Sequence, residues 1–175
     1  YRAEDTKLGR SVAIKLLPAE VSEDPERLGR FQREAQLLAA LSHANVGAIY
    51  QLEEEAGRRF LVLEHVEGRN LKYHARHPDE LLTTDEARLG VMLEVAEGLE
   101  AIQAAGVVHR DIKPSNILLS SGHALVADFG IARAMSEATG VPLTATGLTM
   151  GTPAYMSPEQ AGGESVDGRA DVYSL

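Results

Sequence analysis

An α+β fold is predicted because strand-like and helical segments fall in different parts of the 175-residue chain. Two pairs of short strands are predicted within the first 63 residues, together with one amphipathic helix. A longer helix and a short hairpin are predicted between residues 83 and 127. Strands gathered in one part of a chain and helices in another are typical of α+β domains.

The composition is that of a soluble globular domain, with 44% hydrophobic and 25% charged residues. A net charge of −9 argues against nucleic acid or an anionic membrane surface as the main partner. The absence of cysteine excludes disulfides and thiolate metal sites and fits a cytoplasmic location. No apolar run reaches the roughly 18 residues that a membrane span needs, so no membrane contact is expected within this segment.

Residues 1–17 are predicted to form a hairpin, with a turn at residues 7–10 and a second strand at residues 11–17. Lys15 lies in the otherwise apolar part of that second strand. A lysine in a strand is usually a solvated surface residue, so Lys15 alone indicates no function.

Asp24 followed by Pro25 predicts the start of a helix, with the aspartate as cap and the proline in the first turn. The buried face of this helix is marked by apolar residues at helical spacing, namely Leu28, Phe31, Ala35, Leu38 and Leu41. Glu34 projects along the same stripe, where an unpaired carboxylate would be costly. We therefore predict that Glu34 pairs with a cation, and Lys15 is the candidate.

Two further strands are predicted at residues 46–52 and 59–63, joined by a turn at residues 55–58. A long helix is predicted to begin at a capping box in residues 83–86 and to end at Gly106. The buried stripe of this helix comprises Ala87, Val91, Val95, Leu99 and Ile102.

A loop is predicted at residues 109–116, His-Arg-Asp-Ile-Lys-Pro-Ser-Asn, because proline and serine disfavour a helix there. Asp111 and Asn116 are five positions apart, with Lys113 between them. The loop can therefore bring a carboxylate, a cation and an amide oxygen into one small space. This combination suits phosphoryl transfer, which needs a base for a hydroxyl, a positive charge for a phosphate and an oxygen ligand for a hard metal.

A short hairpin over residues 117–127 follows, with Asn116 at one end and Asp128 at the other. Such a hairpin can present two oxygen ligands to a metal ion side by side. From residue 128 to residue 159 the composition changes to Gly, Thr, Ala and Ser with little periodicity, which is typical of a functional loop.

Four motifs occur in the order found in protein kinases: Val-Ala-Ile-Lys at 12–15, His-Arg-Asp at 109–111, Asp-Phe-Gly at 128–130, and an Ala-Pro-Glu-like segment at 151–159 with serine in place of the alanine. The chain therefore resembles the catalytic domain of a bacterial-type (eukaryotic-like) serine/threonine protein kinase over its whole length. This resemblance implies a two-lobed α+β fold, with a small β-rich lobe that includes the C-helix and a larger, mainly helical lobe.

The resemblance also implies boundaries within the chain. Residues 1–63 correspond to the small lobe, residues 64–68 to the hinge and residues 69–175 to the first part of the large lobe, including an activation segment at residues 128–159. The glycine-rich loop is expected before Tyr1, and further helices are expected after the last residue. By this interpretation the chain is a catalytic-domain fragment truncated at both ends, and the fragment itself is expected to be nearly inactive.

Roles for five residues follow from the resemblance. Asp111 would accept the proton of a substrate hydroxyl, Lys113 would contact the γ-phosphate, and Lys15 would hold the α- and β-phosphates of ATP. Asn116 and Asp128 would hold Mg²⁺, with Mn²⁺ as an alternative. The implied reaction is transfer of the γ-phosphate of ATP to serine or threonine hydroxyls of proteins, that of the non-specific serine/threonine protein kinase class.

The nucleotide site that the resemblance implies is formed by Ala13, Lys15, Glu34, Leu63, Glu64, Val66, Asn116, Leu118 and Asp128. Within this site, backbone groups of Glu64 and Val66 would form hydrogen bonds with adenine. His109 and Phe129 are expected to pack with Leu38 rather than to act in catalysis.

Thr152 resembles a threonine that helps to shape the acceptor site. Arg110 needs an anionic partner, and the resemblance points to phosphorylated Thr144 or Thr146 in the activation segment. Asp171 resembles the aspartate that anchors the catalytic loop through its backbone. The implied partners are protein substrates with serine or threonine acceptors and a kinase dimer that supports autophosphorylation.

Two other functions are compatible with parts of this pattern. A pseudokinase that acts as a binding or scaffold module would keep the fold, but degraded kinases usually lose at least one of the site residues that are intact here. A small-molecule phosphotransferase would carry a related catalytic loop, but residues 151–159 favour a peptide substrate. A glycine-rich segment encoded upstream of this chain would favour an active kinase.

Overall fold

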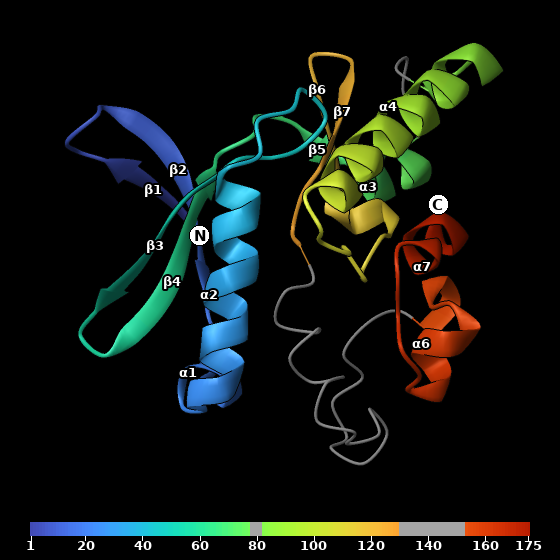
Figure 1. Ribbon diagram of the computed structural model, residues 1–175. Helices are drawn as coiled ribbons and strands as arrows, with labels where there is room; N and C mark the ends of the chain where they lie inside the picture. The colour runs from blue at the N-terminus through green and yellow to red at the C-terminus, as the bar shows by residue number, and fades with distance from the viewer. Residues whose placement is uncertain (78–81, 130–152) are drawn as a thin grey trace.

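The small lobe contains a four-stranded antiparallel sheet with two helices beside it (Figure 1). The computed structural model describes residues 1–77, 82–129 and 153–175. The strands are β1 (Arg2–Asp5), β2 (Arg10–Leu16), β3 (Ile49–Glu55) and β4 (Arg58–Glu64), in the spatial order β1-β2-β4-β3. Both predicted strand pairs are confirmed.

Strand β3 begins at Ile49 rather than at residue 46, where the sequence predicted its start. Val46 instead forms an isolated parallel bridge with Val126 of the large lobe. Asn45 C=O accepts the Val126 N–H at 2.8 Å, and Gly47 donates its N–H to Val126 C=O at 2.9 Å. This link therefore ties the two lobes together instead of extending the small sheet.

Helix α2 (Pro25–Ala39) follows the short helix α1 (Ala19–Ser22) and begins where the sequence predicted. The Asp24 side chain caps it by accepting the backbone N–H groups of Glu26 at 2.9 Å and Arg27 at 3.1 Å. The fully buried positions on its apolar stripe are Phe31, Ala35 and Leu38. Packing of this stripe brings Glu34 to the interface between the lobes.

The large lobe is mainly helical and includes a three-stranded sheet in the order β5-β6-β7. Its elements are β5 (Arg69–Asn70), α3 (Leu71–Arg76), α4 (Asp85–Ala104), the 3-10 helix η2 (Pro114–Asn116), β6 (Ile117–Ser120), β7 (His123–Val126), the 3-10 helix η3 (Pro153–Tyr155), α6 (Pro158–Gly162) and α7 (Arg169–Ser174). Helix α4 packs along β7, as Figure 1 shows. The predicted hairpin between Asn116 and Asp128 is confirmed.

Helix α4 is capped by a threonine, but not by the capping box that the sequence predicted. Thr84 Oγ1 accepts the Ala87 N–H at 3.1 Å. The N-cap residue is Thr84 rather than Thr83, so the third helical position is Ala87 instead of Glu86. An alanine side chain cannot accept the N-cap backbone N–H, which is the second hydrogen bond of a capping box. The helix ends as predicted, since Gly106 has a φ of 79°.

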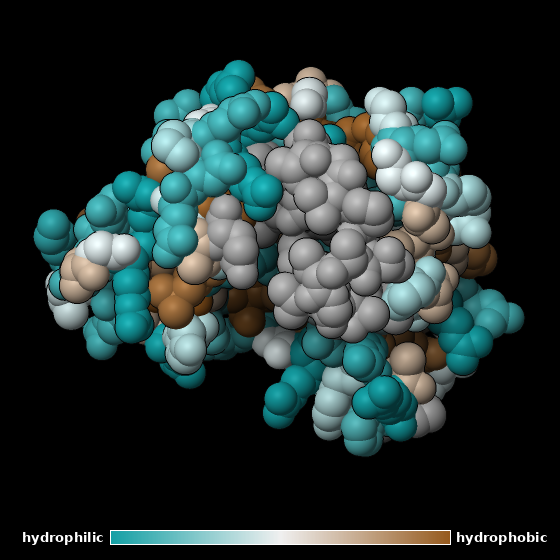
Figure 2. Space-filling view, turned by 90° about the horizontal axis from the view of Figure 1, so that it is seen from below, coloured by the Kyte–Doolittle hydropathy of each residue, from teal (hydrophilic) through white to brown (hydrophobic). Residues whose placement is uncertain are grey.

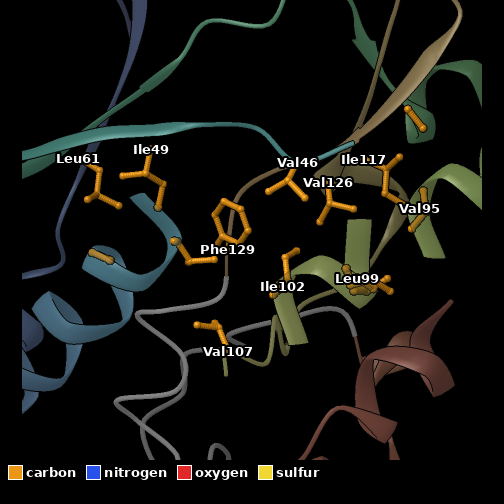
Figure 3. Packing of buried hydrophobic residues seen from close by; sticks show 14 of the residues in the cluster. Val46, Ile49, Leu61, Val95, Leu99, Ile102, Val107, Ile117, Val126 and Phe129 are labelled. Carbon is orange, nitrogen blue, oxygen red and sulfur yellow. The ribbon is translucent and has the colours of Figure 1, made fainter. Parts of the chain in front are cut away.

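One hydrophobic core joins the two lobes (Figure 3). Phe129 lies between Ile49 and Leu61 of the small sheet and Ile102 and Val107 of the large lobe. Burying each such side chain contributes about 1.5–3 kcal/mol relative to exposing it. The phenylalanine of the Asp-Phe-Gly motif is therefore a packing residue, and it holds Asp128 at the boundary between the lobes.

Hydrophilic side chains cover most of the rim of the face in Figure 2, with smaller apolar patches between them. Two apolar side chains of α7 and its C-terminal cap are among those exposed, since Val172 is 64% exposed and Leu175 is 39% exposed. In the described part of the chain, none of the helices combines the length and the apolar composition needed to cross a bilayer.

Gly68 is expected to tolerate no side chain. It has a φ of 154°, and a Cβ added there would lie 2.0 Å from Leu119 O in the neighbouring strand. Gly68→Ala should therefore lower the free energy of unfolding by at least about 3 kcal/mol, the sum of backbone strain and overpacking. Gly57→Ala is the matched control, because its φ is 73° but nothing lies within 4 Å of the added Cβ. Urea unfolding would measure both, and equal losses would show that the contact with Leu119 does not matter.

Candidate active site

The catalytic loop, residues 109–116, is anchored by a buried carboxylate from α7. Asp171 accepts the backbone N–H groups of His109 and Arg110, each at 2.8 Å. This confirms the anchor that the sequence predicted. Arg110 has a φ of 63°, a left-handed conformation that costs a residue other than glycine about 1–2 kcal/mol. The charge-assisted hydrogen bonds from Asp171 offset this strain and hold the loop in a shape that local sequence alone would disfavour.

His109 is fully buried and packs against Phe129, with 5.4 Å between the ring centroids. Its Nδ1 accepts the Asp111 N–H at 3.3 Å, so Nε2 carries the proton and donates to Ala127 C=O at 3.2 Å. Burial lowers the pKa of His109 below its usual value despite the carboxylates nearby. The imidazole is therefore a neutral packing group, as predicted, and it links the catalytic loop to the end of β7.

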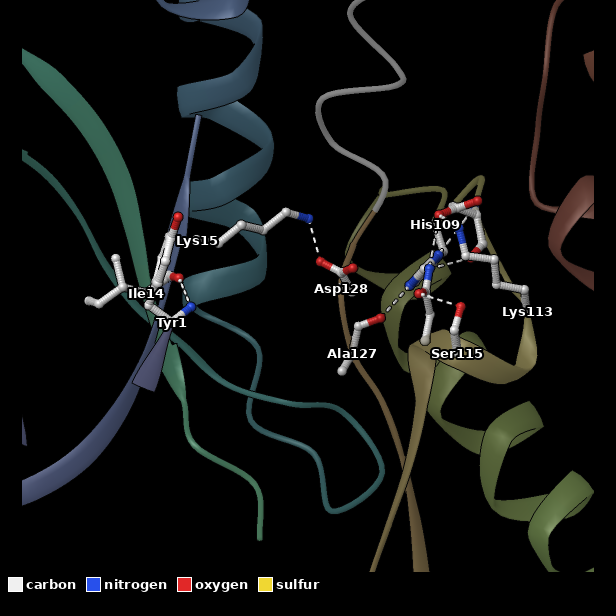
Figure 4. A network of polar contacts seen from close by, with 10 residues as sticks. Tyr1, Ile14, Lys15, His109, Lys113, Ser115, Ala127 and Asp128 are labelled. Carbon is white, nitrogen blue, oxygen red and sulfur yellow. Dashed lines mark hydrogen bonds and ion pairs between the residues drawn. The ribbon is translucent and has the colours of Figure 1, made fainter. Parts of the chain in front are cut away.

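Three polar side chains of the catalytic loop meet at one carboxylate oxygen (Figure 4). Asp111 Oδ2 accepts hydrogen bonds from Lys113 Nζ at 2.6 Å and from Asn116 Nδ2 at 2.9 Å. Asn116 Nδ2 also donates to Asp111 C=O at 2.8 Å. The side chains of Asp111 and Lys113 are each only 19% exposed, so these contacts are partly shielded from water. The loop thus brings together the carboxylate, the cation and the amide that its spacing predicted.

Asn116 and Asp128 lie close together at the base of the β6–β7 hairpin. Ala127 donates its N–H to Asn116 C=O at 2.9 Å, which joins the two ends of the hairpin. Because Asn116 Nδ2 is bonded to Asp111, its Oδ1 is the acceptor atom, and it receives the Ser115 hydroxyl at 3.3 Å. A carboxylate and an amide oxygen are ligands that fit Mg²⁺. No cluster of three or more His, Cys, Asp or Glu side chains that could hold a metal occurs among the described residues.

Lys15 and Glu34 do not form the ion pair that the sequence predicted. Lys15 Nζ on β2 contacts the carboxylate of Asp128 instead (Figure 4). Glu34 Oε1 on α2 lies 3.6 Å from Arg110 Nη1. The prediction is wrong for this conformation because two further charges enter the same space from the large lobe. Asp128 contacts Lys15, and Arg110 lies beside Glu34.

Glu34 lies in a partly desolvated position. Burial raises the pKa of Glu34, and the positive charge of Arg110 offsets this only in part. Its Oε2 is buried and has no hydrogen-bond partner among the described residues. One buried oxygen of the Glu34 carboxylate therefore lacks a hydrogen bond within the described part of the chain. This favours an interaction of Glu34 with a second cation.

The predicted nucleotide contacts lie on several elements: Ala13 on β2, Leu63 and Glu64 on β4, Val66 in the link to β5, and Leu118 on β6. Ala13 and Leu63 are cross-strand partners in the small sheet. Glu64 donates its N–H to Ala48 C=O at 2.9 Å and accepts the Ala48 N–H through its carboxylate at 3.1 Å. Adenine recognition at Glu64 would therefore have to use its carbonyl group.

Three buried or half-buried polar side chains that support the site were not predicted from the sequence. Gln160 donates to Arg110 C=O at 2.8 Å. Glu94 on α4 accepts the Ala124 N–H of β7 at 2.6 Å, and Asn45 donates to Ala124 C=O at 2.9 Å. Glu94 and Asn45 thus hold the hairpin from two sides.

One signal in the sequence could have found Gln160. Ser157 and Gln160 have the spacing of a capping box, and the structure forms both of its hydrogen bonds. The contacts of Glu94 and Asn45 carry no such local signal. Thr144, Thr146 and Thr152, which the sequence analysis singled out, lie outside the described residues.

The two-lobed fold and the arrangement of the catalytic loop define a protein kinase catalytic domain. The chain belongs to the protein kinase domain family, which matches it over residues 1–175. The α+β kinase fold predicted from the sequence is thereby confirmed.

Similar proteins are bacterial kinases. A probable serine/threonine-protein kinase of Streptomyces coelicolor is 43% identical over 179 residues, which cover 99% of this chain and 26% of that protein. The serine/threonine-protein kinase PknB of Mycobacterium leprae is 42% identical over 180 residues, which cover 100% of this chain and 28% of that protein. The chain therefore spans little more than a quarter of the length of these relatives. A crystal structure of the Mycobacterium tuberculosis PknI kinase domain matches with a TM-score of 0.76 at 28% identity, covering 99% of this chain and 64% of that one.

Proposed function

We propose that the protein carrying this chain is a serine/threonine protein kinase that uses ATP and Mg²⁺ to phosphorylate proteins in the cytoplasm, where ATP is supplied. The proposal rests on the Asp111 carboxylate, which Lys113 and Asn116 hold beside the hairpin that carries Asp128. Protein kinases in general use ATP with a divalent metal ion and act on protein substrates. The similar proteins are named serine/threonine-protein kinases.

In this reaction the chain mainly positions groups and supplies charge. Asp111 would accept the proton of the acceptor hydroxyl, because Lys113 and Asn116 fix the orientation of its carboxylate. Asn116 and Asp128 would hold the metal ion, which when bound supplies a positive charge that offsets charge on the phosphates. Lys113 would neutralise charge on the transferred phosphoryl group.

Nucleotide binding should change the partners of Lys15. In the structure Lys15 contacts Asp128 directly, whereas in the proposed reaction Lys15 would hold phosphates of ATP and Asp128 would hold the metal ion. We infer that ATP replaces this direct contact. Glu34 would then leave Arg110 and complete the nucleotide site by pairing with Lys15.

A phosphoryl-transfer assay separates this proposal from its alternatives. The protein would be incubated with radiolabelled ATP, Mg²⁺ and a generic basic protein, and the labelled amino acids would be identified. We expect phosphoserine or phosphothreonine at a turnover of about 1–100 s⁻¹. ATP binding without any transfer would indicate a pseudokinase, and transfer to an aminoglycoside or choline alone would indicate a small-molecule kinase.

Phosphorylation at Thr144 or Thr146 is expected to activate the enzyme. A phosphate adds about −1.5 to −2 charge and can bind a guanidinium through two oxygens, so it should displace Glu34 from Arg110. We expect mass spectrometry to find phosphate at one of these threonines in the wild type but not in Asp111→Asn, as autophosphorylation within a kinase dimer requires.

The double variant Thr144→Ala/Thr146→Ala should lose activity at least several-fold. Thr149→Ala is the control, because the resemblance to bacterial kinases points to Thr144 and Thr146 and not to Thr149. Full activity in the double variant would show that Arg110 does not depend on this phosphate.

A further inference from the structure

Gln160 is a polar side chain in a position where an apolar one would ordinarily pack. It is the third residue of α6 and only 2% exposed. Both ends of its amide are used: Oε1 accepts the Ser157 N–H at 3.1 Å, and Nε2 donates to Arg110 C=O at 2.8 Å. The first contact belongs to the cap of α6, whereas the second reaches the catalytic loop.

The second contact acts on the peptide unit from which Asp111 projects. The Arg110 C=O and the Asp111 N–H belong to one planar peptide. Gln160 holds the C=O end, and His109 Nδ1 holds the N–H end at 3.3 Å. On the other side of Arg110, Asp171 holds the N–H at 2.8 Å. The N–H and C=O groups of Arg110 and the N–H group of Asp111 therefore each have a hydrogen-bond partner, and one of the three partners comes from α6.

The chemistry of the contact requires an amide. A carboxylate at position 160 could accept the Ser157 N–H but would turn an oxygen instead of a donor toward the Arg110 C=O. An apolar side chain of the same size would leave the buried Ser157 N–H and the half-buried Arg110 C=O without this partner, which is costly for each group. Size alone thus does not explain glutamine at this position.

We propose that Gln160 is a positioning residue for phosphoryl transfer: it sets the plane of the Arg110–Asp111 peptide, and through it the direction of the Asp111 carboxylate, without touching substrate. The proposal rests on the proposed kinase function. It adds that the segment after residue 152 contributes directly to the geometry of the catalytic base.

The test compares Gln160→Met and Gln160→Glu in the protein that carries this chain. For Gln160→Met we expect kcat to fall by about 10–100-fold, because small displacements of a reacting group have effects of this order. The affinity for ATP should stay within about twofold of the wild type, because no described contact of Gln160 reaches the nucleotide site.

For Gln160→Glu the pH dependence is decisive. A glutamic acid buried against a carbonyl has a raised pKa, and its protonated form can donate to Arg110 C=O as the amide does. The kcat ratio of Gln160→Glu to wild type should therefore rise several-fold as the pH falls from about 8.5 to 5.5. Gln51→Glu, the same change at an exposed position on β3, should show a ratio near one at every pH.

Wild-type kcat in both variants would overturn the proposal, and so would a loss in Gln160→Glu that does not change with pH. If Gln160→Met does not fold, as thermal melting would show, the pH-dependent ratio for Gln160→Glu decides the matter. A wild-type protein that binds ATP but transfers no phosphate would refute the proposed function, and with it the role of Gln160.

Discussion

Asp111→Asn is expected to lower kcat for protein phosphorylation by about 10²–10⁴-fold, the usual contribution of a general base. Asparagine has nearly the same shape, and its oxygen can still accept a hydrogen bond from Lys113 or Asn116. It cannot take up the proton of the acceptor hydroxyl, however, and it carries no charge. The fold should therefore persist while the chemical step is lost.

The affinity for ATP separates this explanation from general damage. Asp111 lies on the acceptor side of the proposed reaction, so nucleotide affinity measured by fluorescence titration should stay close to that of the wild type. Asp167→Asn is the matched control, because Asp167 is exposed and its carboxylate contacts only Arg169 among the described residues. A wild-type rate in Asp111→Asn would remove Asp111 from the proposed mechanism.

Asp128→Asn should weaken Mg²⁺-dependent nucleotide binding and catalysis together. The substitution removes the only carboxylate that we assign to the metal, and a hard cation loses affinity when a charged oxygen ligand becomes neutral. We expect a loss of about 10–100-fold in apparent affinity for Mg·ATP, in line with the effect of disturbing a metal site. The direct contact between Lys15 and Asp128 also loses its charge in this variant.

Titration in the presence and absence of Mg²⁺ tests the metal assignment. Without Mg²⁺ the variant should bind ATP at least as well as the wild type, because a negative charge near the phosphates has been removed. With Mg²⁺ it should bind more weakly. An equal loss under both conditions would mean that Asp128 acts on the fold or on Lys15 rather than through a metal.

Local signals account for the parts of the structure that the sequence predicted well. The cap at Asp24, the hairpin after Asn116 and the helix end at Gly106 each depend on residues that are neighbours in the chain. The meeting of Asp111 with Lys113 is equally local, because the loop spans only a few residues. Such features form wherever the same short sequence can adopt its preferred turn or cap.

Features that depend on the approach of distant segments were predicted poorly. The sequence placed the start of β3 at residue 46, but Val46 pairs with Val126, eighty positions away. It paired Lys15 with Glu34, but in the structure Lys15 contacts Asp128 and Glu34 lies beside Arg110. Coulombic attraction acts on the nearest suitable charge, and a sequence pattern cannot rank distances across an interface between lobes.

The sequence by itself determined the family, the order of the motifs and the chemical groups that the catalytic loop contains. Only the tertiary structure decided how those groups are held. Asp171 and Gln160 reach the backbone of Arg110 from α7 and α6, and together they stabilise a left-handed residue directly before the catalytic aspartate. The reason is physical: a strained backbone and a buried polar group are stable only when partners from other elements satisfy them, and those partners are set by packing rather than by local sequence.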